Sequence, residues 1–192
     1  MTETTADPRA SEKRRRIVAA AWRLALRGGL RATTMEALAR EAGIAKGTLY
    51  AHFPDKEAVF DAVVADLLVE LGEAFDRDLA SAGPVAERIG AALAGKYGVV
   101  ARAIEGSPHA GEILDAHHRF AARVAAFDRR VEVEVAAALA TAGAADPEAL
   151  ARLVVGAANG VARAHAGADA IDRAIRLVCR RLIEPAIPSP RA

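Results

Sequence analysis

Lys46, Gly47, Thr48, Tyr50 and His52 stand within seven consecutive residues and have the groups that proteins use to contact nucleic acids. An ammonium, hydroxyls and an imidazole can donate hydrogen bonds to phosphate oxygens or to base edges. The glycine would let a backbone approach another molecule closely. This stretch therefore predicts a DNA-contacting surface, with Lys46 and Thr48 at the end that reaches base edges or phosphates.

Two threonines extend this prediction. Thr33 and Thr34 stand where a helix would begin, so hydroxyls and free backbone amides there could bind a phosphate. Thr33 and Glu36 also have the spacing of a capping box, and the threonines could serve as caps alone.

The elements that must position these side chains are helices. Ala, Leu, Arg and Glu dominate, aromatic residues make up only 4 %, and apolar residues recur every three or four positions. The predicted fold class is all-α, with about nine helices near residues 11–28, 33–42, 45–53, 55–79, 85–104, 109–117, 120–139, 147–166 and 169–184. Ser11, Asp55, Asp146 and Asp169 are the expected N-caps of four of them.

The second and third predicted helices are separated only by a short turn at Gly43, which makes a helix-turn-helix. Short helical pairs with a glycine turn also occur in enzymes. Through Lys56, eleven Lys and Arg residues stand against six Asp and Glu, a net charge of +5, while the rest of the chain carries −4. A basic head suits a polyanionic partner, although ordinary surface charge in an arginine-rich proteome gives the same composition.

The string from Ile17 to Phe60 resembles the DNA-binding region of the TetR family of bacterial transcriptional regulators. The matching residues are Ile17, Ala20, Ala21, Leu24, Gly29, Thr33, Thr34, Met35, Ala39, Ala42, Gly43, Ile44, Gly47, Thr48, Leu49, Tyr50, His52, Phe53, Lys56, Glu57 and Phe60. The resemblance implies a three-helix DNA-binding head and DNA contact by Thr34, Lys46, Gly47, Thr48, Tyr50, His52 and Lys56.

The string departs from the family pattern at three positions. Ala25 and Leu30 stand where large aromatic residues are usual, so Trp22 or Leu26 is expected to fill the small core of the head. Ala45 replaces the usual serine or threonine cap of the recognition helix.

A DNA-binding head of this kind implies a homodimer, because one helix reads only a few base pairs and two copies match a two-fold operator. Small residues on the predicted eighth helix and an apolar row on the ninth suit such an interface, and both faces could equally pack within one chain. The candidate interface residues are Gly156, Gly160, Ala164, Ile171, Ile175, Val178 and Leu182.

The resemblance also implies a small-molecule effector pocket enclosed by the predicted fifth, sixth and seventh helices. The candidates are Leu93, Tyr97, Val100, His109, His117, Phe120, Val124, Phe127 and Asn159, of which the apolar members would also suit an ordinary core. These side chains favour a mostly apolar effector with a few hydrogen-bonding groups.

The residues do not favour an enzyme. The histidines lack the spacing of a metal site, no phosphate loop or G-x-S-x-G motif occurs, and the single cysteine, Cys179, excludes an internal disulfide. No apolar run is long enough to cross a membrane. We therefore expect a cytoplasmic, non-enzymatic protein without cofactor, metal or membrane partner, with a helical metal-binding or enzyme bundle as the rival class.

The predicted organisation is a disordered arm at 1–10, a helix-turn-helix domain at 11–56, a ligand-binding and dimerisation domain at 57–187 and a tail at 188–192. The predicted function is a homodimeric repressor that a small molecule releases from a palindromic operator on double-stranded DNA. A ligand-responsive activator or a co-repressed regulator would have the same sequence signature.

Overall fold

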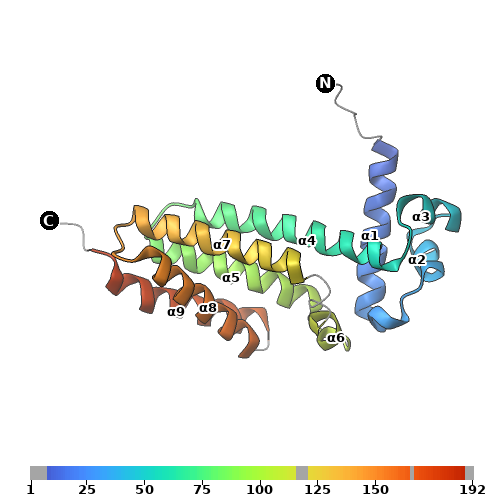
Figure 1. The fold of residues 1–192 in the computed structure, drawn as a ribbon. Helices are drawn as coiled ribbons and strands as arrows, with labels where there is room; N and C mark the ends of the chain where they lie inside the picture. Colours follow the sequence, from blue (N-terminus) through green and yellow to red (C-terminus); the bar gives the residue numbers. More distant parts are fainter. Residues whose placement is uncertain (1–7, 116–120, 165–166, 189–192) are drawn as a thin grey trace, which may run out of the picture. The chain divides into compact units, whose positions relative to one another are not determined.

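A computed structural model describes residues 8–115, 121–164 and 167–188, in which all regular structure is helical (Figure 1). The all-α prediction is confirmed. The helices are α1 (Pro8–Ala32), α2 (Met35–Ala42), α3 (Lys46–His52), α4 (Lys56–Leu79), α5 (Val85–Ile104), α6 (Ala110–Asp115), α7 (Ala121–Thr141), α8 (Pro147–Ala164), α9 (Ala168–Ile183) and the short 3-10 helix η2 (Glu184–Ala186).

The chain forms two compact units. The first combines residues 1–67 with 106–121, and the second combines residues 68–105 with 122–192, so that the boundary falls within α4. This division by packing differs from the functional boundaries expected from the sequence, which stay a prediction. Most of the arm expected at 1–10 lies outside the described residues, but residues 8–10 already belong to α1.

The core of the first unit is built largely from small residues. α1 contributes Ile17 and three alanines, α2 contributes Leu38, and α3 contributes Leu49. Trp22 is partly buried against this core, as expected from the absence of an aromatic residue at position 25. Small side chains let the helices of the head approach closely, so the position of α3 is set by close packing.

Two of the four expected N-caps are confirmed. The Asp55 carboxylate accepts a hydrogen bond from Ala58 N (2.7 Å), and Asp146 does the same for Ala149 N (3.0 Å). The expectations for Ser11 and Asp169 are wrong, because α1 begins three residues before Ser11 and α9 begins at Ala168, directly after Gly167.

The capping box expected at Thr33 and Glu36 is also wrong. Thr34 is the N-cap of α2, and its hydroxyl oxygen accepts from Ala37 N (3.1 Å). The Thr33 hydroxyl is buried and donates to the carbonyl of Gly29 (2.9 Å). One hydroxyl therefore caps α2 while the other ties its start to the end of α1.

The first helical segment of α1 ends as predicted at Gly28 and Gly29, because Gly29 is non-helical (φ 80°, ψ 165°), and a short second segment continues across this kink to Ala32. Residues of the α6 region bind the backbone on both sides of this kink. Ser107 Oγ donates to the carbonyl of Leu26 (2.8 Å), and Glu112 Oε1 accepts from Arg31 N (3.0 Å). Side chains thus replace backbone hydrogen bonds that the kink removes.

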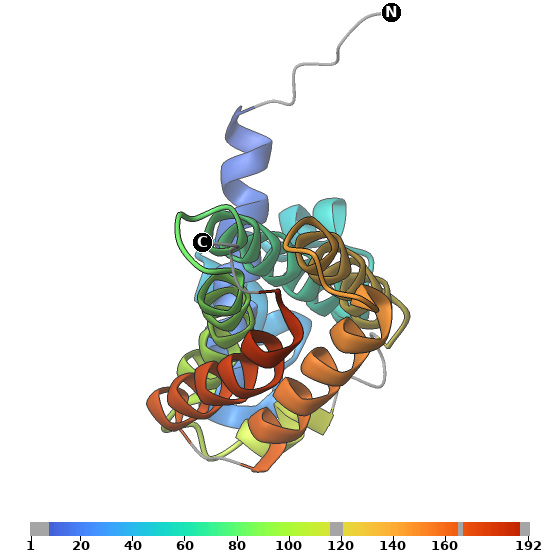
Figure 2. The ribbon, with the colours of Figure 1, turned by 90° about the vertical axis from the view of Figure 1, so that its left-hand side faces the viewer.

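In the second unit, α9 lies beside α5 and α8 (Figure 2). Gly90 lets α5 approach α9 closely, since a Cβ at this position would lie 3.4 Å from the Cα of Arg176. The inner face of α9 is formed by Ile171, Ile175, Cys179 and Ile183, all of them buried. This packing uses the apolar side of α9 within the subunit.

The kink yields a prediction with a matched control. An alanine at Gly29 would have to adopt a positive φ, and its Cβ would collide with the Glu112 carboxylate and lie 3.0 Å from His109 Nδ1. We expect Gly29→Ala to lower the free energy of unfolding by about 1–3 kcal/mol in urea titrations. Gly28→Ala, where an added Cβ meets only Ala32 Cβ at 4.0 Å, should be neutral or stabilising. Equal effects of the two substitutions would contradict this role of the kink.

Candidate nucleic-acid interface

α2 and α3 form the predicted helix-turn-helix, and Gly43 makes the turn. This residue is left-handed (φ 64°), and its N–H donates to the carbonyl of Arg40 (3.2 Å) while Ile44 N donates to Ala39 O (3.0 Å). These two bonds satisfy the last carbonyls of α2 in the way typical of a glycine-ended helix. The chain then enters α3 after two residues.

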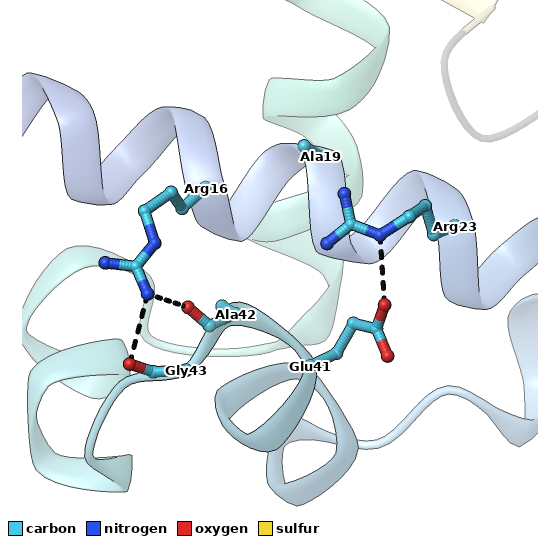
Figure 3. A pocket seen from close by; sticks show the side chains of 6 residues that line it. All are labelled: Arg16, Ala19, Arg23, Glu41, Ala42 and Gly43. Atoms are coloured by element: carbon cyan, nitrogen blue, oxygen red, sulfur yellow. Dashed lines mark hydrogen bonds and ion pairs between the residues drawn. The ribbon is translucent and has the colours of Figure 1, made fainter.

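Three arginines of α1 hold this turn in place. Arg16 Nη2 donates to the carbonyls of Ala42 (2.6 Å) and Gly43 (3.2 Å), as Figure 3 shows. About two and three turns further along α1, Arg23 Nε and Arg27 Nη2 bind the two carboxylate oxygens of Glu41 at 2.9 and 2.7 Å. The open depression of about 240 Å³ in Figure 3 is lined by Arg16, Ala19, Arg23, Glu41, Ala42 and Gly43, and the bonds across it join α1 to α2.

The two sides of α3 differ in what they contact. Leu49 and the adjoining Phe53 are buried in the core of the head. Lys46, Gly47 and Tyr50 are exposed, with 45 % of the Tyr50 surface accessible. An added Cβ at Gly47 would meet no atom within 4 Å. The outer face of α3 is therefore open to another molecule, and packing within the described head gives no reason for a glycine there.

Thr48 and His52 are half-buried, so they border this outer face. Lys56 Nζ is partly buried and donates to the carbonyl of Leu30 (3.3 Å), near the kink of α1. The structure thus brings Lys46, Gly47, Thr48, Tyr50 and His52 together on α3. Thr34 is exposed at the start of α2, whereas Thr33 is buried.

Lys46 is paired rather than free. Its Nζ donates to Glu36 Oε1 in the first turn of α2 and lies 5.9 Å from the centre of the Tyr50 ring. The hydrogen bond from Lys46 is the main cause of the lowered pKa of the Glu36 carboxyl, and the same bond raises the pKa of Lys46. Both groups are therefore charged at neutral pH.

Much of the positive charge of the head is likewise neutralised internally. Arg14 binds both carboxylate oxygens of Asp66 (3.0 and 3.1 Å), and Arg15 pairs with Glu12. Glu12 and Glu41 are already subtracted in the net charge of +5, and Arg16 binds uncharged carbonyls, so among these partners only Asp66, beyond residue 56, lowers the charge that a polyanion would meet. Sequence counting could not reveal these pairs, since their members are often distant along the chain.

The predicted effector residues fall in both units of the chain. In the second unit Leu93 and Phe127 are buried, and Tyr97, Val100 and Val124 are half-buried. Asn159 is exposed on α8. His109 belongs to the first unit, beside the kink of α1, and His117 and Phe120 lie outside the described residues.

The sequence reasoning missed a buried cation among these residues. Lys96 is 7 % exposed, and its Nζ donates to Asp128 Oδ1 (2.6 Å) and to the Tyr97 hydroxyl (3.3 Å). The ammonium also lies 4.4 Å from the Tyr97 ring centre and 5.6 Å from that of Phe127. Burial is the main reason why the pKa of Tyr97 is raised. The sequence could have indicated that Lys96 is buried, because Lys96 lies on the helical face that carries Leu93, Tyr97 and Val100.

The predicted dimer residues separate into two sets. Gly156, Gly160 and Ala164 are exposed on α8, and an added Cβ at either glycine would meet nothing within 4 Å. Ile171 and Ile175 are buried inside the subunit, and Val178 and Leu182 are half-buried. Leu153 on α8 and Leu177 on α9 are large exposed apolar residues that the sequence reasoning missed.

In the described part of the chain, no three His, Cys, Asp or Glu side chains are grouped so that they could hold a metal ion, and no helix is long and apolar enough to cross a bilayer. Burial raises the pKa of the Cys179 thiol to about 12, so this thiol is protonated at neutral pH. Cys179 is therefore not an activated nucleophile.

Comparisons with known proteins agree with this geometry. The family model for bacterial regulatory proteins of the tetR family matches residues 17–63, which include α2, α3 and the start of α4. Over 82 residues the chain is 33 % identical to the uncharacterized HTH-type transcriptional regulator YhgD of Bacillus subtilis, an alignment that spans 43 % of each protein. The chain thus matches less than half the length of this relative.

Two solved structures have the same fold over almost the whole chain. A candidate TetR-family transcriptional regulator from Mesorhizobium loti superposes with a TM-score of 0.72 at 20 % identity, over 95 % of this chain and 100 % of that one. SmeT, the repressor of the Stenotrophomonas maltophilia multidrug efflux pump SmeDEF, gives 0.67 at 19 % identity, over 94 % and 100 %. Residues 17–63 of this chain therefore match the model of the tetR family of bacterial regulatory proteins, and the chain shares its fold with these two solved structures.

Proposed function

We propose that the chain is a homodimeric transcriptional repressor that binds a palindromic operator on double-stranded DNA and is released by a small-molecule effector. The observation that carries the DNA-binding part is the outer face of α3, where Lys46, Gly47 and Tyr50 are exposed while Leu49 anchors the helix in the core. A short helix held rigidly with such a face can enter the major groove.

The proposed DNA contacts are divided by chemistry. Lys46, Thr48 and the backbone at Gly47 would approach base edges, while Tyr50, His52, Thr34 and Lys56 would bind phosphates. The Thr34 oxygen already accepts a backbone N–H, but its hydroxyl proton remains available to a phosphate oxygen. We leave Thr33 out of the proposed contacts because its hydroxyl is buried and donates to Gly29.

Gly47→Leu tests this surface. The site has room for a side chain within the protein, so the free energy of unfolding should stay the same or rise by about 0.5 kcal/mol. A leucine would nevertheless block close approach to a groove, and we expect duplex affinity to fall at least about tenfold, a loss of about 1.4 kcal/mol. Fluorescence anisotropy with duplexes selected from a randomised pool measures this duplex affinity.

Gly111→Leu is the matched control. Gly111 is also an exposed helical glycine of the first unit with open space around it, but it lies on α6. It should leave duplex affinity unchanged. Wild-type affinity in Gly47→Leu, or a wild type that shows no salt-dependent preference for any duplex, would contradict the proposal.

We propose that α8 supplies the centre of the dimer interface. Leu153, Gly156, Gly160 and Ala164 recur every three or four residues and are exposed, with 55 % of Leu153 accessible. The two glycines would let a helix of a second copy approach closely. Leu177 on α9 extends the apolar surface, joined by the half-buried Val178 and Leu182. Ile171 and Ile175 are left out because the subunit core already holds them.

Leu153→Asp should dissociate this dimer without unfolding the subunit. A carboxylate buried in an apolar interface is costly, so the dimer dissociation constant should rise by about a hundredfold or more. Val133→Asp on α7, where the valine is 68 % exposed, makes the same chemical change elsewhere and should leave the dimer intact. Sedimentation equilibrium decides, and a wild type that is monomeric at micromolar concentration would overturn the interface.

The effector part of the proposal concerns the second unit. Leu93, Tyr97, Val100, Val124 and Phe127 remain the apolar candidates, and Lys96 with Asp128 supplies the polar groups beside them. Asn159 is exposed on the same helix as the proposed interface, and His109 lies with the head, so neither is kept as a pocket residue. Repression rather than activation is favoured by the likeness to SmeT, which is the repressor of a multidrug efflux pump. We place the protein in the cytoplasm, without catalytic activity.

A further inference from the structure

The ion pair between Glu36 and Lys46 is unusual in its position. Glu36 is the second residue of α2 and Lys46 the first of α3, so the pair connects the two helices of the helix-turn-helix. Both side chains are more than half exposed, at 62 % and 56 %. Lys46 is next to Gly47 and within cation–π range of Tyr50, which places the carboxylate at the edge of the open face of α3.

A contribution to folding stability does not explain well why the Glu36 carboxylate stands at this position. Exposed ion pairs contribute little to folding, although an acid in the first turn of a helix is mildly favourable. At a surface that meets phosphates, a negative charge opposes binding, and pairing with Glu36 also withdraws the charge of Lys46 from non-specific contacts. Glu36 would therefore be favourable at this surface only if the bound DNA offered it a hydrogen-bond donor.

The major-groove edge of a G·C pair offers the complement of this ion pair. Guanine presents two acceptors, N7 and O6, and the cytosine beside it presents an amino donor at N4. An ammonium next to a carboxylate matches these groups, with Lys46 donating to guanine and Glu36 accepting from cytosine. Resting on the proposed function, we propose that Glu36 and Lys46 act as one unit that reads a single G·C pair in each half-site, and that Glu36 is a specificity-determining residue.

The test uses the full-length protein and duplexes selected from a randomised pool. Wild-type protein should select a motif with one G·C pair per half-site whose change to A·T lowers affinity by about five- to a hundredfold. Glu36→Ala and Lys46→Ala should each reduce this preference to within about twofold at the same base pair, and the double variant should lose no more. Glu36→Ala should also bind duplexes without the motif more tightly, with a salt slope steeper by about 0.9 because Lys46 becomes free for a phosphate.

Glu12→Ala is the control, since it removes an acid from another exposed pair of the head, that with Arg15. It should leave every base preference unchanged. Preferences that persist in Glu36→Ala, or that are lost at different base pairs in the two single variants, would overturn the inference while leaving DNA binding intact. A wild type that selects no motif would instead overturn the proposed function, and the inference with it.

Discussion

The structure of the head depends on the bonds from Arg16 to the carbonyls that end α2. Backbone carbonyls at a helix end need donors, and in this turn Arg16 supplies them for Ala42 and Gly43 while Gly43 supplies the left-handed conformation. The guanidinium holds the turn through which the chain leaves α2, and close packing of the helices sets where α3 lies. Leu49 then anchors α3 from the inside, which leaves Gly47 and Tyr50 on the outside. The open face is thus a consequence of how the turn is closed.

The sequence predicted the parts of the head that local rules govern. The turn at Gly43 and the Asp55 cap follow from glycine conformation and capping. The helical segment that follows Gly29 could not be predicted, because Ser107 and Glu112, which bind the backbone beside it, are distant in sequence. The charge count likewise could not show which charges are paired, such as Arg23 and Arg27, which both bind Glu41.

In the second unit, periodicity identified apolar faces but not what covers them. The row through Ile171 and Ile175 has the spacing of an interface helix, yet α5 approaches closely enough at Gly90 to bury it within the subunit. Among the described residues, the small-residue stripe on α8 has no such neighbour within 4 Å of a Cβ added at Gly156 or Gly160. In the sequence, an apolar row and a glycine stripe are equally good candidates for a dimer interface. Only the positions of the neighbouring helices show which of the two is buried within the subunit and which is exposed.

The central claim is that the outer face of α3 is the surface that meets duplex DNA. Hydrogen–deuterium exchange of the full-length protein, alone and with a selected duplex, tests this most directly. Exchange should slow in α3 and in the first turn of α2, where the contacts are proposed, and should change little at the amides of Gly43 and Ile44, whose bonds already close the turn. Unchanged exchange in α3 under saturating duplex, with protection confined to the second unit, would contradict the account.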